Sequence, residues 1–336
     1  MGATAINLKI YIPIKVAALQ LFYFKEMKRK SPYQFYSSTA LILFITIVCM
    51  GLKPPKSNVE KIELDKPLNT NNSLLWQISG NELTKPSYLF GTIHIISRND
   101  FFLGKNVSKK LTKSEELIME TDLNNIDIAA LTKRSTLDSG KTIKDYMNDS
   151  DYTILQSFME DSIGIKKNTF EQFYAKLKPF YLEQLIFFTY LGQEKESYEE
   201  VLKKTVEDKK IPQTGLETFE EQLLFLEEIP LDLQLKSIVK TIKNYSTETK
   251  KLDELIRDYK EQNLNSLTKA FEEDEDPIWK EKLLNKRNNN WVPKLNTLMH
   301  SKSSFIAVGA GHLGGENGLI NLLRKQGYTV EPISIN

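Results

Sequence analysis

Two histidines of this chain stand three residues after a glycine, each at the end of an apolar run. The segments are SYLFGTIH, which ends at His94, and SFIAVGAGH, which ends at His312, and the 336 residues contain one further histidine. An imidazole can ligate a divalent metal ion or transfer a proton near neutral pH. Glycine lets the backbone turn tightly or approach a ligand closely, so each imidazole can point into a cleft. The repeated spacing therefore predicts one site shared by His94 and His312.

Carboxylates at the ends of other predicted strands can supply the third ligand that usually accompanies two imidazoles. Glu120 is the best candidate by position, because it ends the apolar run in ELIMETDL and would point into the same cleft. Asp122 shares that face if the strand continues. Glu217, in GLETFEEQ, stands at another strand exit, although acidic residues also favour helix starts. Either Glu217 or Asp122 is a candidate to accept a proton from water.

A further polar feature is the pair Arg287 and Asn288 in KRNNNW. A guanidinium is a forked donor that can hold a carboxylate or a developing oxyanion. Spacing alone, however, favours a simpler interpretation of Arg287 as a cation on a helix surface. The remaining histidine, His300 in TLMHSK, is expected at a helix end, where the helix dipole favours it, and outside the shared site.

The apolar pattern indicates which elements position these side chains. Residues 74–123 carry strand signals, with a hairpin turn at Gly80-Asn81. Residues 127–300 have apolar residues at three- and four-residue steps, which is typical of helices, interrupted by one strand over 211–218. From Ser304 onward the order is strand, helix and strand, which predicts a β-α-β unit.

Both histidine motifs therefore leave the ends of strands, where ligand sites gather in sheets that are flanked by helices. We predict an α/β (α+β) fold with a central β-sheet flanked by helices, in which the two Gly-x-x-His strand ends form the site. A long helical section, about residues 127–300, is expected as an insertion between them, within a single domain over residues 57–336.

The N-terminal segment has the pattern of a targeting signal. MKRK, from Met27, is a compact positive cluster, and ALILFITIVCMGL is an uncharged run shorter than a comfortable membrane span. We expect residues 1–56 to form this segment, with Met27 as a candidate for the true start, and an uncleaved membrane anchor is the alternative. In either case the folded domain is expected to be exported and to face away from the cytoplasm.

Composition excludes several functions. Lys and Arg total 45 against 44 Asp and Glu, so charge gives no support for nucleic-acid binding. The single cysteine, Cys49, excludes an intramolecular disulfide and a cysteine-based metal cluster. A site of nitrogen and oxygen ligands instead suits manganese, cobalt, iron or zinc.

Five segments, taken together, carry a resemblance: LWQISGNELTKPSYLFGTIHII, LIMETDL, GLETFEEQ, KRNNNWV and AVGAGHLGGENGLINLLRKQGYTV. They resemble the TraB/PrgY/GumN family, which includes the Tiki-type metalloproteases, from about Leu74 to Pro332. The resemblance implies a metal-dependent hydrolase whose active site contains both motif histidines and a glutamate. Carried onto this chain, the implied metal ligands are His94, His312 and Glu120, and the further implied site residues are Glu217, Arg287 and Asn288.

Manganese or cobalt is the metal that the resemblance implies, with zinc or iron as the alternatives. The expected function is a peptidase that acts on a peptide or protein through a metal-activated water. Two other functions stay open: a non-catalytic protein that binds a peptide or metal, and an esterase-type carbonyl hydrolase.

Overall fold

The computed structural model describes residues 72–122, 128–138, 140–192, 194–274 and 276–336. The predicted targeting segment at residues 1–56, the start at Met27 and the possible membrane anchor lie outside the described residues. Within the described ranges, no helix is both long and apolar enough to cross a membrane.

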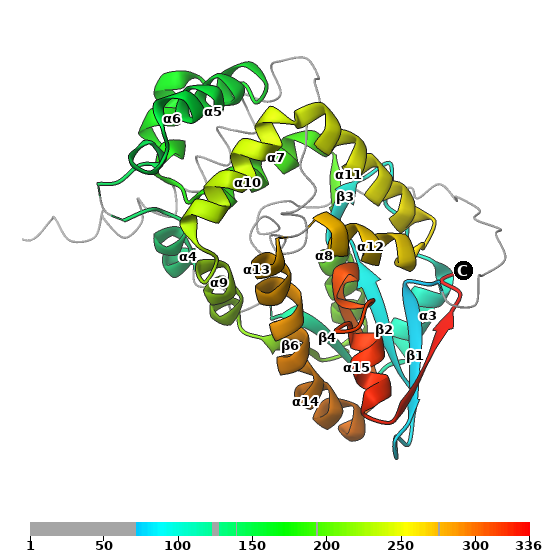
Figure 1. Cartoon of the computed structure of the whole chain (residues 1–336). Helices are drawn as coiled ribbons and strands as arrows, with labels where there is room; N and C mark the ends of the chain where they lie inside the picture. The colour runs from blue at the N-terminus through cyan, green and yellow to red at the C-terminus, as the bar shows by residue number, and fades with distance from the viewer. Residues whose placement is uncertain (1–71, 123–127, 139, 193, 275) are drawn as a thin grey trace, which may run out of the picture. The chain divides into compact units, whose positions relative to one another are not determined.

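A six-stranded sheet forms the centre of the fold (Figure 1). Its strands in spatial order are β6 (Gln213–Glu217), β4 (Glu116–Thr121), β7 (Ser304–Gly309), β2 (Ser87–Thr92), β1 (Leu75–Gly80) and β8 (Tyr328–Ile333). The first four are parallel, whereas β1 runs antiparallel to both of its neighbours. The predicted α/β fold with a central sheet is confirmed.

The two histidine strands are direct neighbours in this sheet. β2 and β7 pair in parallel, with Gly91 opposite Val308 and Thr92 opposite Gly309. Parallel neighbours end at the same edge, so both motifs leave the sheet side by side. The predicted hairpin precedes them, because β1 pairs antiparallel with β2 around a turn in which Gly80 has φ +76°.

The C-terminal unit differs in one respect from the predicted β-α-β unit. The helix is α15 (Leu319–Lys325), and the chain then enters β8, as expected. However, β8 pairs with β1 rather than with β7, so the β1–β2 hairpin lies between the two strands of the unit. Local pattern predicts the order of elements along the chain, but it carries no information on which strand β8 will pair with.

Helices make up most of the rest of the described chain. They are α3 (Lys105–Lys113), α4 (Ile128–Arg134), η2 (Ile143–Tyr146), α5 (Asp149–Asp161), α6 (Lys167–Gln172), η3 (Tyr174–Lys176), α7 (Pro179–Tyr190), α8 (Tyr198–Lys209), α9 (Phe219–Glu227), α10 (Leu231–Lys243), α11 (Tyr245–Lys260), α12 (Leu264–Asp274), α13 (Pro277–Lys280), the π-helix η4 (Glu281–Asn285), α14 (Lys286–Ser301) and η5 (Ala310–His312).

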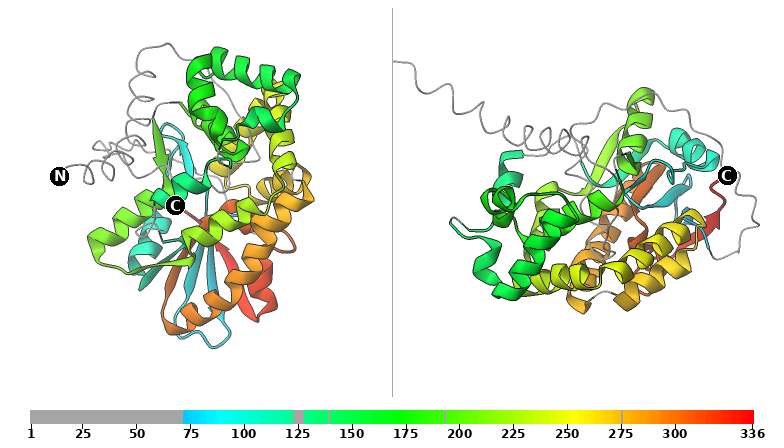
Figure 2. Two further views of the ribbon diagram at one scale, coloured as in Figure 1. Left: turned by 90° about the vertical axis from the view of Figure 1, so that its left-hand side faces the viewer. Right: turned by 90° about the horizontal axis from the view of Figure 1, so that it is seen from above.

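Each face of the sheet packs on its own helices, because side chains alternate between the faces along a strand. In β7, Phe305 and Ala307 join an apolar cluster with residues of α3 and α8. Ile306 and Val308 join a second cluster with residues of α14 and α15. The sheet is therefore enclosed between two helical layers (Figure 2).

The middle of the chain is mostly helical, as predicted, but it returns one strand to the central sheet. The expected strand over 211–218 is β6, which pairs in parallel with β4 at the edge of the sheet. A short strand, β5 (Lys195–Ser197), instead pairs with β3 (Ile95–Ser97) in a separate two-stranded sheet. β6 thus interrupts the helical section, and it places Glu217, a candidate site residue, at the edge of the sheet.

Candidate active site

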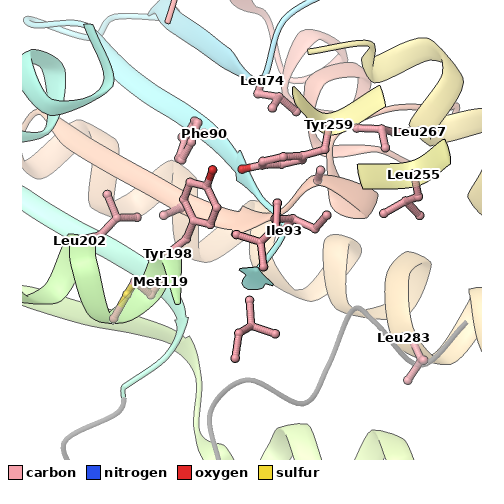
Figure 3. Close-up of a cluster of buried hydrophobic side chains, with 14 of the residues drawn as sticks. Leu74, Phe90, Ile93, Met119, Tyr198, Leu202, Leu255, Tyr259, Leu267 and Leu283 are labelled. Carbon is pink, nitrogen blue, oxygen red and sulfur yellow. The ribbon is translucent and has the colours of Figure 1, made fainter. Parts of the chain in front are cut away.

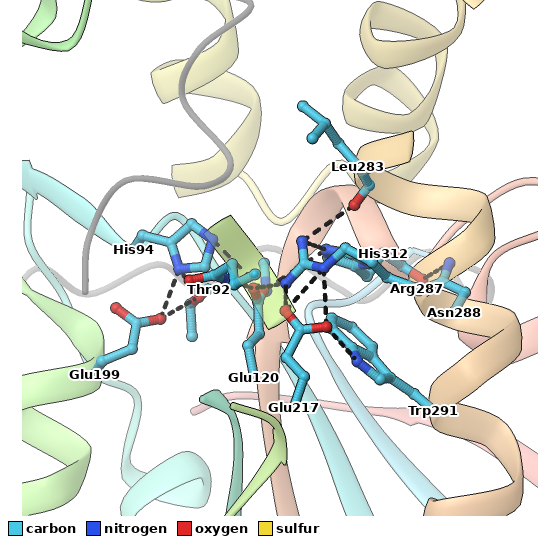
Figure 4. A network of polar contacts seen from close by, with 12 residues as sticks. Thr92, His94, Glu120, Glu199, Glu217, Leu283, Arg287, Asn288, Trp291 and His312 are labelled. Carbon is cyan, nitrogen blue, oxygen red and sulfur yellow. Dashed lines mark hydrogen bonds and ion pairs between the residues drawn. The ribbon is translucent and has the colours of Figure 1, made fainter. Parts of the chain in front are cut away.

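The candidate site lies where the four parallel strands end (Figure 4). Each strand contributes a polar side chain close to its carboxyl end: Glu217 from β6, Glu120 from β4, His312 after β7 and His94 after β2. Parallel strands bring their carboxyl ends to one edge, where ligand sites gather in α/β proteins. Residues far apart in the sequence are therefore neighbours here.

The two motif imidazoles converge on one carboxylate oxygen. Nε2 of His94 lies 3.6 Å from Oε1 of Glu120, and Nε2 of His312 lies 3.7 Å from the same oxygen. All three side chains are buried. The two nitrogens are therefore well within the separation of roughly 10 Å beyond which they could not ligate one ion.

His94 is held in an unusual conformation with one nitrogen directed at Glu120. Its φ of 55° is left-handed, which is uncommon for a residue other than glycine and is typical of functional sites. Its Nδ1 lies 2.8 Å from Oε1 of Glu199, and the Thr92 hydroxyl donates to the same oxygen at 2.8 Å. In the described part of the chain, its buried Nε2 has no hydrogen-bond partner.

Burial by itself would lower the pKa of His94, because it removes the imidazolium from water. The carboxylates of Glu199 and Glu120 outweigh that effect and raise the pKa to about 8. His94 is thus the more basic of the two imidazoles.

His312 is fixed as a neutral imidazole. Its Nδ1 donates to the side-chain oxygen of Asn288 at 2.7 Å, and its Nε2 accepts from Nη1 of Arg287 at 3.2 Å. Burial, together with the nearby guanidinium and the other imidazole, lowers the pKa of His312 to about 3 although Glu120 acts in the opposite direction. The approach of His312 to Glu120 is therefore not an ion pair at neutral pH.

Arg287 is a fully buried cation at the centre of the network. Its Nη2 donates to Oε2 of Glu120 and to Oε1 of Glu217, each at 2.6 Å, and its Nε contacts both oxygens of Glu217. Its Nη1 also donates to the carbonyl of Leu283 at 3.1 Å, in the π-helix η4 that precedes α14. The interpretation of Arg287 as a surface cation is therefore wrong, because the helix presents it to two buried carboxylates.

Glu217 is a partner of this guanidinium. Both of its oxygens accept from Arg287, and Oε2 also accepts from Nε1 of Trp291 at 3.0 Å. Trp291 in turn packs against His312, with the ring centroids 4.5 Å apart and the ring planes tilted by 38°. Glu217 thus holds the network together, and the geometry gives less support to the predicted alternative in which it accepts a proton from water.

Glu120 is a carboxylate whose two oxygens have different neighbours. Oε2 accepts from Arg287 and from the Gln222 amide, while Oε1 accepts from the backbone N–H of Gly309 at 2.8 Å. Burial would raise the pKa of Glu120, but Arg287 and the two imidazoles lower it to about 2. Asp122, the other predicted carboxylate, is half-buried two residues further on. Glu217 rather than Asp122 lies across Arg287 from Glu120.

The glycines of the two motifs have separate steric roles. A Cβ on Gly309 would lie 2.8 Å from Nε2 of His94 and 3.3 Å from Oε1 of Glu120. A Cβ on Gly91 would instead lie 2.9 Å from a methyl group of Leu313, in the loop that follows His312. Gly309 therefore leaves the centre of the site open, and Gly91 permits close packing of the two strand ends.

Asn288 holds the loop that carries His312 in place through hydrogen bonds. Besides accepting from Nδ1 of His312, its amide donates to the carbonyl of Asn317 at 2.8 Å. His300 lies elsewhere, exposed in the last turn of α14, as expected.

Sequence reasoning missed Glu199, Thr92, Gln222 and Trp291. Glu199 lies in the first turn of α8, where an acidic residue is unremarkable because it favours the helix N-terminus. Its contact with His94 arises from the pairing of β3 with β5, which brings the start of α8 next to the end of β2. No local signal distinguishes it from its neighbour Glu200.

A sequence model of the TraB/PrgY/gumN family matches residues 74–332, which is most of the chain. The chain belongs to the TraB/PrgY/gumN family. The chain is also similar to curated proteins: metalloprotease TIKI1 of Danio rerio is 24% identical over 79% of this chain, and TIKI1 and TIKI2 of Xenopus tropicalis are 25% and 24% identical over 80%.

This family member spans only part of those relatives, covering 64%, 63% and 61% of their lengths, respectively. No solved structure gives a significant match to it.

Proposed function

We propose that this chain is a metal-dependent hydrolase, and that it cleaves peptide bonds as the name of its metalloprotease relatives suggests. The observation that supports the proposal most strongly is the convergence of Nε2 of His94 and Nε2 of His312 on Oε1 of Glu120. Two imidazole nitrogens and one carboxylate oxygen form a ligand set that is common at catalytic divalent cations.

The two imidazoles and the carboxylate fit a divalent cation, provided that Arg287 moves away from Nε2 of His312. Each Nδ1 is engaged by a neighbouring oxygen, from Glu199 or from Asn288, which leaves each Nε2 as the ligating atom. The Nε2 of His94, which has no hydrogen-bond partner among the described residues, is the buried polar atom that such an ion would satisfy. Among the described residues, no group of three or more His, Cys, Asp or Glu is arranged to hold a metal ion as it stands. We propose that Arg287 must withdraw Nη1 from His312 before the ion binds.

A bound ion would lower the pKa of a water molecule and polarise the substrate carbonyl. The chain's own groups have complementary tasks. Glu199 and Asn288 orient the two imidazoles, and Gly309 keeps the space beside His94 and Glu120 open.

Arg287 is the proposed donor to a developing oxyanion. Its Nε and Nη2 are committed to Glu217 and Glu120, and one N–H of Nη1 donates to the carbonyl of Leu283, so the other N–H of Nη1 is the group that becomes available when it leaves His312. A buried, preorganised cation stabilises such charge far more than one in water does.

A metal-independent hydrolase is the second candidate, and His94 favours it. Its Nε2 has no hydrogen-bond partner in the described chain, its Nδ1 is oriented by Glu199, and its pKa of about 8 suits a general base. Without a metal, His94 would take the proton from water and Arg287 would stabilise the oxyanion.

The experiment that separates these candidates uses the purified full chain, treated with a chelator and then dialysed. A library of peptides and a matched set of ester substrates are each incubated with this protein alone and with added Mn²⁺, Co²⁺ or Zn²⁺, and the products are identified by mass spectrometry. The proposal predicts cleavage only after metal is restored, and loss of cleavage in His94→Ala but not in His300→Ala. Full cleavage by the chelated protein would support the metal-independent candidate, and cleavage of esters alone would make the chain an esterase.

The predicted export remains a part of this proposal, because residues 1–56 lie outside the described structure. A peptidase facing away from the cytoplasm would meet exported proteins as substrates.

A further inference from the structure

Trp291 lies beside the candidate site, one helical turn after Arg287 in α14 (Figure 4). Residues four positions apart share one face of a helix, so the two side chains are neighbours on α14. The indole is fully buried. It is therefore placed to act on the polar network as well as on the apolar core.

The indole contacts three members of the polar network through different parts of its ring system. Its N–H donates to Oε2 of Glu217 at 3.0 Å. Its ring centroid lies 4.6 Å from Cζ of Arg287 and 4.5 Å from the ring centroid of His312. One side chain thus joins the buried cation, a carboxylate that neutralises it and one of the two imidazoles.

The contact with Arg287 is of a kind that leaves the N–H groups of the guanidinium available. The cation lies over the indole ring, and its attraction to the ring face is electrostatic and grows when water is excluded. Among aromatic side chains, tryptophan gives the strongest attraction of this kind. The contact can therefore persist when Nη1 of Arg287 leaves His312, because it does not use that N–H group.

His312 is held by α14 from three directions. Asn288 accepts from its Nδ1 at 2.7 Å, Arg287 donates to its Nε2 at 3.2 Å, and Trp291 packs against its ring. When the guanidinium withdraws, as the proposed metal binding requires, Asn288 and Trp291 are the two contacts from this helix that keep Nε2 directed into the site.

The other imidazole of the site has a different support. Figure 3 shows Ile93, the residue before His94, in an apolar cluster with Tyr259. Trp291 belongs to the second apolar cluster, on the other face of the sheet. A change at Trp291 should therefore affect His312 and leave His94 in place.

We infer that Trp291 is a positioning residue for Arg287 and His312. It retains the guanidinium in the site when Nη1 is released, and it keeps the imidazole of His312 oriented toward the metal ion. The inference rests on the proposed function for the metal, but the contacts involve only the chain's own side chains, so one of its tests needs no metal.

The chain contains a matched control for this tryptophan. Trp76 is also buried and belongs to the same apolar cluster. Its N–H donates to the carbonyl of Ser73 at 2.8 Å, and Cζ of Arg324 lies over its ring at 5.6 Å. Trp291→Leu and Trp76→Leu therefore remove the same kinds of contact, so a difference between them reports on the site rather than on the loss of a buried tryptophan.

The first test uses the chelated full chain without added metal. Nitrogen NMR of the imidazoles shows which ring nitrogen carries the proton, and comparison with His94→Gln and His312→Gln assigns the signals. Wild type and Trp76→Leu are expected to hold His312 with its proton on Nδ1 alone. Trp291→Leu should lose this single form of His312 and leave His94 unchanged. A proton that stays on Nδ1 alone in Trp291→Leu, or the same loss in Trp76→Leu, would overturn the inference.

The second test titrates the same proteins with Co²⁺. Trp291→Leu should weaken the affinity by about 10–100-fold, which is usual for the loss of a group that supports a metal ligand, whereas Trp76→Leu should leave it unchanged. Trp291→Phe keeps an aromatic ring but loses the N–H, so its affinity should lie between those of Trp291→Leu and wild type. If Trp291→Leu does not fold, Trp291→Phe is compared with Trp76→Phe, and equal Co²⁺ affinities in these two variants would overturn the inference.

Together the tests separate this inference from the proposed function. If folded wild type binds no Co²⁺ and the single form of His312 is lost only in Trp291→Leu, the metal-dependent hydrolase is rejected and the positioning role is retained. If wild type and the Trp291 variants bind Co²⁺ equally and His312 keeps its proton on Nδ1 in all of them, the metal site is retained and the positioning role is overturned.

Discussion

Gly309 lies against the imidazole of His94, so closely that a methyl group on Gly309 would be 2.8 Å from Nε2 of His94. Gly309→Ala should therefore fill the centre of the site and reduce kcat/KM by at least about 100-fold, since small displacements of catalytic groups have effects of that size. Gly91→Ala is the control, because its Cβ would contact Leu313 instead. It should lower the melting temperature with a smaller effect on kcat/KM of the folded protein. Equal activity in Gly309→Ala and wild type would contradict this steric account.

Arg287 neutralises two buried carboxylates, which makes it the residue whose loss should affect stability most. Arg287→Ala leaves Glu120 and Glu217 buried without their cation, and breaking a buried ion pair in this way costs about 3–5 kcal/mol. Urea unfolding followed by circular dichroism measures this loss.

The double variant Arg287→Met with Glu217→Gln tests the cause. It removes one charge of each sign, so it should recover part of the stability lost in Arg287→Ala but none of the activity. A double variant no more stable than Arg287→Ala would show that charge neutralisation is not the role of Arg287.

Glu199 orients the imidazole of His94, whose Nε2 has no hydrogen-bond partner in the part of the chain that the structure describes. Glu199→Gln removes the charge beside Nδ1 of His94 and should weaken metal affinity by about 10–100-fold, which is usual for the loss of a group that orients a metal ligand. Isothermal titration with Co²⁺ measures the affinity. Glu200→Gln, at the next position of the same helix, should leave it unchanged, and equal affinities in wild type and Glu199→Gln would refute the orienting role.

His312 should make the fold sensitive to mild acid. Its pKa is about 3 in the folded chain against an ordinary value of 6.5, so below pH 6.5 the unfolded chain binds the additional proton and the free energy of unfolding falls. His94 has the opposite effect, but only above pH 6.5, because its folded pKa is about 8. Between pH 6.5 and the ordinary carboxylate value of 4.5, His312 should contribute a slope of up to about 1.4 kcal/mol per pH unit.

The measurement is urea unfolding at several pH values over this range. His312→Gln, which does not titrate, should show a flatter dependence on pH than wild type, whereas His300→Gln should keep the wild-type slope. The same slope in His312→Gln and wild type would mean that His312 is not buried as a neutral imidazole.

A feature of this structure could be predicted from the sequence when neighbouring residues in the chain determine it. The ends of β2 and β7 are marked locally, by an apolar run followed by glycine, so both histidine positions and the central sheet could be predicted. The pairing of β8 with β1 could not, because strand order depends on contacts between distant segments.

The same distinction separates the site residues that were predicted from those that were missed. Glu120 could be predicted because it lies close to the end of a buried strand, and the neighbouring strands of the sheet determine which residues it contacts. Glu199 reaches His94 only through the packing of α8, and the burial of Arg287 depends on which side of α14 faces the sheet. Contacts of this kind become visible only when the chain is folded.

The central claim is that one divalent ion binds between His94 and His312, and Co²⁺ titration of the chelated full chain tests it most directly. The visible absorption of Co²⁺ reports its ligands, and we predict a spectrum with nitrogen and oxygen ligation that saturates at one ion per chain. His94→Ala and His312→Ala should each abolish this spectrum, while His300→Ala should retain it. A spectrum unchanged by both substitutions, or no Co²⁺ bound by folded wild type, would contradict the account.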